Sequence, residues 1–173
     1  MRIAETKVYS FKELSDEAKQ EARNNYMNNF GYAFGDDAIF SLKKGCEAFG
    51  GSLQRYSIDF FESSPSSAVF DMPELSHDEI KEIIQSLGEV DPETGKGAGD
   101  CMLTGYCADE DVLDGIREAF NSGIDDINIL MQRGFVSWLK ACQDDCECSY
   151  KDEAFGEHCD SNEYEFTEHG KMW

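Results

Sequence analysis

The stretch DINILMQRGFVSWLKACQDDC, residues 126–146, carries the longest helical pattern in the chain. Its large apolar residues recur at intervals of four and three, which is the spacing of one face of an α-helix. They are Ile127, Met131, Phe135, Trp138, Cys142 and Cys146. A stripe this long and this apolar has to be covered by other parts of the chain, so we expect the helix to be largely buried along it.

Shorter helices are predicted on both sides of this stretch. Ser15 is placed to cap a helix that runs to about Asn28, and a second helix begins near Asp37 and ends at Gly50-Gly51. The sequence Ser76-His77-Asp78-Glu79 is a capping box, and the helix it opens ends at Gly88. Two more helices are predicted, from Asp109 to about Phe120 and from Lys151 onward.

Four segments have strand patterns: 6–11, 56–61, 68–72 and 164–166. Residues 63–67, Ser-Ser-Pro-Ser-Ser, have the chemistry of a turn, so the second and third segments are expected to pair antiparallel. Helices on a small antiparallel sheet give the α+β class. We expect a single compact domain over residues 1–173, with a flexible loop at about residues 91–100.

The charge of the chain is strongly negative. It has 15 Lys and Arg against 36 Asp and Glu, a net charge of −21, where roughly 2–8 in magnitude is usual for a small domain. Residues 1–50 are nearly neutral, with 7 basic and 8 acidic side chains, so the surplus lies in the remainder. Such a chain is repelled by nucleic acid and by anionic lipid, and basic protein surfaces are its natural partners.

Cellular location follows from what the sequence lacks. No apolar run approaches the roughly 18 residues of a membrane span, and the N-terminal residues have no continuous apolar segment like that of a signal peptide. We therefore expect a cytoplasmic protein. The chain has seven cysteines, an odd number, which favours reduced thiols over a disulfide framework.

Patterns typical of catalysis or metal binding are weak. Cys142, Cys146, Cys148 and Cys159 invite a zinc site, but the second pair lacks the usual spacing, and burial of the first two on the apolar stripe explains them better. Gly95-Lys96-Gly97 does not complete a phosphate loop, and Asp109–Phe120 does not match a calcium loop. We expect no cofactor, no metal and no enzymatic activity.

Three segments, 9–19, 103–111 and 162–170, together resemble a group of small acidic proteins of tailed bacteriophages and prophages. Their sequences here are YSFKELSDEAK, LTGYCADED and NEYEFTEHG. Members of that group are often labelled "antitoxin of a toxin–antitoxin stability system". The resemblance implies action in the cytoplasm of a host cell and implies no catalytic residues.

The expected function is binding and inhibition of a host protein that handles nucleic acid in defence, a CRISPR effector or a restriction enzyme. Carboxylates along 71–93, 109–126 and 144–168 would occupy lysine and arginine sites that normally hold phosphates. The alternative is an antitoxin-like protein that neutralises a basic toxin. The residues predicted to contact the partner are Tyr106, Asp109, Glu110, Asp111, Asp114, Asp144, Asp145 and Glu147. Charge reversal at Asp109, Glu110 and Asp111 is expected to weaken capture without unfolding the protein.

Overall fold

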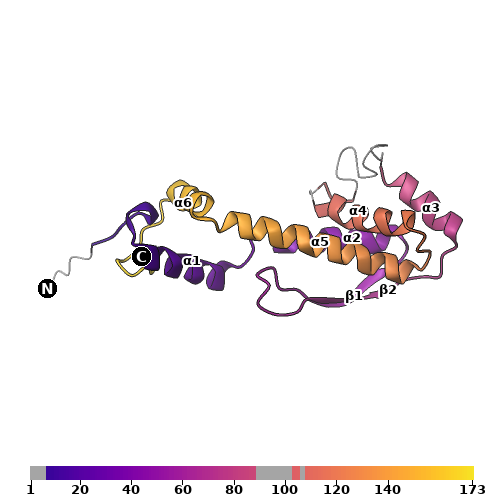
Figure 1. The fold of residues 1–173 in the computed structure, drawn as a ribbon, viewed down its shortest axis with the longest axis horizontal. Helices are drawn as coiled ribbons and strands as arrows, with labels where there is room; N and C mark the ends of the chain where they lie inside the picture. Colours follow the sequence, from indigo (N-terminus) through magenta and orange to yellow (C-terminus); the bar gives the residue numbers. More distant parts are fainter. Residues whose placement is uncertain (1–6, 89–102, 106–107) are drawn as a thin grey trace. The chain divides into compact units, whose positions relative to one another are not determined.

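The computed structural model describes residues 7–88, 103–105 and 108–173 (Figure 1). Within these ranges it contains six α-helices, one short 3-10 helix and a two-stranded antiparallel sheet, which confirms the α+β class. Contacts divide the chain into two compact units: the central unit, residues 34–144, and the terminal unit, residues 1–33 with 145–173. The single domain over the whole chain stays a prediction, and the loop expected at 91–100 lies outside the described residues.

The central unit is built on the predicted long helix. That helix, α5, runs over Ile127–Ser149 and contributes its residues up to Asp144 to this unit. All six residues of the predicted apolar stripe are buried, as expected. The other elements of the unit are α2 (Gly35–Ala48), β1 (Ser52–Ser57), β2 (Ser67–Asp71), α3 (His77–Ser86) and α4 (Ala108–Asn121).

Glycines allow the central helices to approach one another closely. A Cβ atom added at Gly115 of α4 would lie 2.7 Å from the backbone oxygen of Arg133 in α5, closer than carbon and oxygen can pack. A Cβ atom at Gly45 of α2 would lie 2.8 Å from Val112 of α4 in the same way. These two contacts hold α4 between α2 and α5, and so fix the place of the carboxylates that α4 carries.

The predicted hairpin is present, with a shifted first strand. β1 and β2 pair antiparallel, with Leu53 opposite Phe70 and Tyr56 opposite Ala68. The prediction of a strand over 56–61 is wrong beyond Ser57. Asp59 takes the chain out of the strand, because its carboxylate accepts hydrogen bonds from the backbone nitrogens of the turn that follows.

The terminal unit packs α1 (Asp16–Phe30), α6 (Asp152–Ser161) and a 3-10 helix, Phe11–Glu13, around its own core. The buried residues of that core are Phe11, Leu14, Ala18, Ala22, Phe155, Cys159 and Phe166. Ser15 caps α1, as predicted, by accepting a hydrogen bond from the backbone nitrogen of Ala18.

The two strands predicted near the chain ends are not formed as strands. Tyr9 and Phe166 make an isolated antiparallel bridge, and Phe166 makes a second one with Met172. The chain leaves the extended conformation after Ser10, where a capping box with Glu13 opens the 3-10 helix. The alternation of polar and apolar residues in this segment therefore reflects a turn that buries Phe11.

Candidate functional site

The carboxylate of Asp109 lies inside the fold rather than on the surface. Asp109 is 0% exposed, in the first turn of α4. Its Oδ2 accepts hydrogen bonds from the backbone nitrogens of Leu103, Thr104 and Gly105, at 3.1, 2.6 and 3.1 Å, and its Oδ1 accepts one from the Thr104 hydroxyl at 2.8 Å. Four donors and the positive end of the helix stabilise this buried charge.

The same network reaches α2. The Thr104 hydroxyl lies 3.2 Å from the hydroxyl of Ser41, which is itself buried. Asp109 thus fixes residues 103–105 against both helices. Burying a carboxylate is costly unless it is hydrogen-bonded, and here the donors come from one short loop. The role of Asp109 is to hold that loop, and it presents no surface to a partner.

Two further candidate carboxylates surround a buried arginine. Arg117, 3% exposed, donates from Nη1 to Glu110 at 2.9 Å and to Asp114 at 3.2 Å. Its Nη2 donates to the backbone oxygen of Leu87 at 3.1 Å, which joins α4 to the end of α3. An arginine in this position needs its carboxylates, because removing one partner of a buried pair leaves a charge without compensation.

Most of the α4 carboxylates that were predicted to contact a partner are therefore bonded within the fold. Asp109, Glu110 and Asp114 are bonded within the fold, and Asp111 is only partly exposed. Tyr106, the aromatic residue predicted to contact the partner, lies outside the described residues. The expectation that reversing the charge of Asp109 leaves the protein folded is corrected, since a lysine there would lose four hydrogen bonds and bury an unpaired cation.

The second predicted group lies along the end of α5. Asp144 accepts a hydrogen bond from Lys140 at 2.5 Å in the central unit. In the terminal unit, Asp145 accepts one from the Tyr32 hydroxyl at 2.6 Å, and Glu147 is exposed. These carboxylates are on the surface, but the first two are already engaged with neighbouring side chains.

The cysteines of the zinc alternative have different surroundings. Cys142 and Cys146 are buried on α5, as the stripe predicts, and Cys159 is buried on α6, whereas Cys148 is exposed. Burial raises the pKa of the Cys159 thiol to about 11, so it stays protonated near neutral pH. Over the described ranges, no three His, Cys, Asp or Glu side chains gather as metal ligands would.

Some of the carboxylates that the fold leaves exposed in the central unit lie along β2 and α3. Asp71, Glu74, Asp78 and Glu82 are all exposed, and we call them the α3 acidic surface. Asp78 and Glu82 are four residues apart on one side of the helix and form no ion pair or hydrogen bond with any side chain in the described parts of the chain. The sequence predicted an acidic segment at 71–93, but singled out no residue in it.

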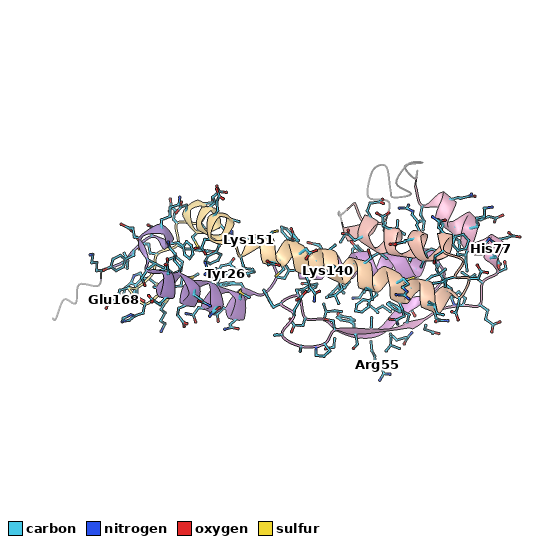
Figure 2. All side chains as sticks on the ribbon, in the orientation of Figure 1. Tyr26, Arg55, His77, Lys140, Lys151 and Glu168 are labelled. Atoms are coloured by element: carbon cyan, nitrogen blue, oxygen red, sulfur yellow. The ribbon has the colours of Figure 1, made fainter. Side chains whose placement is uncertain are left out.

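The α3 acidic surface is held on a rigid support. Ile80, on the inner side of α3, is fully buried, and the predicted capping box of Ser76 and Glu79 is present. The His77 ring, labelled in Figure 2, stacks on Phe120 with centroids 4.8 Å apart and contacts Asp125 at 2.8 Å. These contacts hold the first turn of α3 against the end of α4. The signal that could have found this surface is the spacing of Ile80, Ile83 and Ile84, because an apolar stripe indicates which side of a helix is buried and which faces solvent.

No family model, curated protein or solved structure matches this chain. Within the described residues, no helix has the combined length and apolar character of a membrane span.

Proposed function

We propose that this protein binds a basic, nucleic-acid-binding surface of another protein, and that the α3 acidic surface makes the contact. The observation that supports this is the contrast between the two helices. Three carboxylates of α4, those of Asp109, Glu110 and Asp114, are bonded within the fold. Asp78 and Glu82 of α3 are exposed and form no ion pair or hydrogen bond with a described side chain. Exposed like charges repel one another, so a surface of this kind gains most when a partner supplies cations.

The charge of the chain supports the same function at long range. The central unit, residues 34–144, has 8 Lys and Arg against 22 Asp and Glu. A field of this sign accelerates the encounter with a basic surface, and salt weakens it. Mutating a charge at the rim of an interface mainly changes the association rate. The residues in direct contact with the partner determine how long the complex lasts.

The partner class we propose is a host protein of nucleic-acid-based defence, a CRISPR effector or a restriction enzyme. The resemblance to proteins of tailed phages suggests this setting, and the negative charge suggests the site. By occupying cations that normally hold phosphates, the protein would exclude the nucleic acid and so inhibit its target.

The test begins with capture from a host lysate at low salt, a salt wash, and mass spectrometry of the eluate. The captured protein, once purified, is titrated with its nucleic acid in the presence of this chain. We expect displacement of the nucleic acid, with an affinity that falls as NaCl is raised. Capture that is undiminished in molar NaCl, or a captured protein that binds no nucleic acid, contradicts the proposal.

Two matched variants locate the contact. The double variant Asp78→Lys, Glu82→Lys is expected to weaken binding by about tenfold or more. The control Glu17→Lys, Glu21→Lys changes the net charge equally, at exposed positions with the same spacing on α1. If both variants lose affinity equally, the total charge rather than the α3 acidic surface determines binding.

A further inference from the structure

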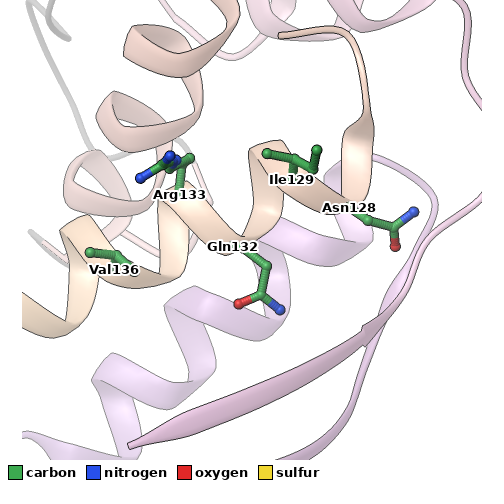
Figure 3. Close-up of a pocket in the computed structure, with 5 residues that line it drawn as sticks. All are labelled: Asn128, Ile129, Gln132, Arg133 and Val136. Atoms are coloured by element: carbon green, nitrogen blue, oxygen red, sulfur yellow. The ribbon is translucent and has the colours of Figure 1, made fainter.

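Surfaces that expose large apolar side chains in this protein differ in the charge beside them. An open depression of about 340 Å³ on α5 is lined by Asn128, Ile129, Gln132, Arg133 and Val136 (Figure 3). Its charged lining residue, Arg133, is a cation and repels the basic partner proposed above. Another such surface surrounds Trp173 in the terminal unit, and an exposed carboxylate lies beside it.

Trp173 is exposed but held in place. It is 69% exposed, more than any other large apolar side chain in the described parts of the chain. Its amide donates to the backbone oxygen of Glu165 at 2.8 Å, which fixes the backbone beneath the side chain. Among the described residues, no ring stacks on its indole and no cation lies over it. Tryptophan is enriched at the hot spots of protein interfaces, so a fixed and uncovered indole indicates a contact point.

The side chain of Glu165 lies beside that of Trp173. Phe166 and Met172 form an antiparallel bridge, which places Glu165 opposite Trp173. Phe166 is fully buried and Met172 packs against the same core, so the residues next to them point outward. Opposite residues of an antiparallel pair have Cβ atoms about 4.5–5.5 Å apart. The Glu165 carboxylate is exposed and forms no ion pair or hydrogen bond with a described side chain.

We infer that Trp173 and Glu165 together bind an arginine side chain of a basic protein partner. A guanidinium is attracted to the face of an indole, and it pairs with a carboxylate through two parallel hydrogen bonds. The terminal unit has 7 Lys and Arg against 14 Asp and Glu, so it attracts the same cation at longer range. The inference rests on the proposed function for the class of partner, and adds to it a contact in the second unit.

Lys171 gives the inference a sign that can be tested. It lies opposite Thr167, whose amide donates to its backbone oxygen at 2.8 Å, and it shares the outward side with Trp173. Lys171 forms no ion pair with a described carboxylate, so it does not neutralise Glu165. It does reduce the local attraction for a cation. Removing its charge should strengthen binding of a basic partner, whereas it would weaken binding of an acidic one.

The accessibility of Trp173 reports on this site directly. The chain has two tryptophans and Trp138 is fully buried, so acrylamide quenches mainly the fluorescence of Trp173. We expect a nona-arginine peptide at low salt to protect Trp173, and a nona-glutamate peptide to leave it accessible. The variant Asp78→Lys, Glu82→Lys should keep this protection, because the α3 acidic surface is not part of the site. An indole that stays accessible with nona-arginine, or that nona-glutamate protects, overturns the inference.

Single charge variants show whether the neighbouring residues act as inferred. Titrated by the same protection, Glu165→Gln should weaken binding of nona-arginine by about threefold or more, and Lys171→Gln should strengthen it by about twofold. Glu153→Gln is the matched control, since Glu153 is an exposed carboxylate on α6 of the same unit, and it should leave binding nearly unchanged. Equal losses in Glu165→Gln and Glu153→Gln would mean that the charge of the unit determines binding, and would overturn the inference.

Trp173→Leu separates attraction to the indole face from apolar contact, because leucine is apolar and has no ring. In the Asp78→Lys, Glu82→Lys background, it should weaken binding of a fluorescent nona-arginine peptide by about three- to tenfold, as anisotropy measures. Phe30→Leu, at another exposed aromatic residue of the terminal unit, should leave binding unchanged. Circular dichroism checks that both variants stay folded. Undiminished binding in Trp173→Leu overturns the inference.

Failure of this inference and failure of the proposed function give different results. A captured protein that binds no nucleic acid contradicts the proposed function, and leaves the protection of Trp173 by nona-arginine unchanged. A Trp173 that stays accessible with nona-arginine contradicts only the inference. Protection that rises with the concentration of this chain alone would identify a second copy as the occupant, and would also overturn it.

Discussion

Helices α3 and α4 both begin with acidic first turns and lie in the same unit, yet they use their carboxylates in opposite ways. The first turn of α4 contains Asp109, which is fully buried and accepts four hydrogen bonds. The exposed side of α3 carries Asp78 and Glu82, which form no ion pair or hydrogen bond with a described side chain. The comparison shows that a run of acidic residues does not by itself indicate a binding surface.

The difference arises from what surrounds each helix. α4 is packed between two other helices and has its own arginine, Arg117, seven residues after Glu110 and three after Asp114. α3 packs mainly through Ile80, and its acidic side faces solvent. Of the four predictions below, three test this division and one tests a carboxylate in the turn between β1 and β2. They run from the largest expected effect on stability to the smallest.

The largest effect is expected at Asp109. Asp109→Ala removes the acceptor for three backbone nitrogens and one hydroxyl in a buried site, so the free energy of unfolding should fall by about 3–5 kcal/mol. Urea denaturation measures it. Asp78→Ala, the matched change on α3, should stay within about 0.5 kcal/mol of the wild type. Similar losses in the two variants would contradict the division between the helices.

Arg117 should come next. Arg117→Met keeps much of the apolar volume but leaves Glu110 and Asp114 without their cation, at a cost of about 2–4 kcal/mol. A double-mutant cycle with Glu110→Gln should show a coupling energy of about 1–3 kcal/mol. Additive losses would mean that the arginine acts only by packing. Lys81→Met on α3 is the control, because Lys81 is exposed.

The turn between β1 and β2 should show a pH dependence. Hydrogen bonds from the Ser63 hydroxyl, the Phe61 amide and Ser64 lower the pKa of Asp59 to about 2, below an ordinary value near 3.8. The stabilisation is complete above the unfolded-state pKa and is lost as pH falls through about 2. The difference in Tm between wild type and Asp59→Asn should therefore narrow between pH 4 and pH 2. A constant difference would contradict the role of this carboxylate.

The smallest effect is expected at His77. Its contact with Asp125 is exposed on both sides, and pairs of this kind contribute about 0–1 kcal/mol. His77→Ala should accordingly change the free energy of unfolding by no more than about 1 kcal/mol, most of it from the lost stacking on Phe120. A larger loss, measured by urea denaturation, would show that α3 depends on this residue for its position.

Local signals predicted most of the fold. Ser15 and Ser76 cap α1 and α3, as predicted. These caps were predictable because a cap and its partners lie within four residues of each other. The apolar stripe of α5 was predictable for the same reason, since helical spacing alone brings its members together. The strands predicted near Tyr9 and Phe166 failed, because pairing there involves segments far apart in sequence and a capping box at Ser10 competes with it.

The candidate site was predictable only in part. The sequence located the acidic segments but did not predict the burial of Asp109, because nothing local marks that residue as buried. Its donors come from the preceding loop, and that loop is held by Ser41, 63 residues earlier. The sequence alone did not distinguish the exposed carboxylates of α3 from the many other Asp and Glu residues of the chain.

The sequence by itself determined the charge of the chain, the caps of its helices and the apolar face of α5, since each depends on residue type and short spacing. The tertiary structure alone decided which carboxylates are structural and which are exposed to solvent. The physical reason is that burial depends on neighbours in space. Arg117 reaches the backbone of Leu87, and Thr104 reaches Ser41, only after the chain has folded.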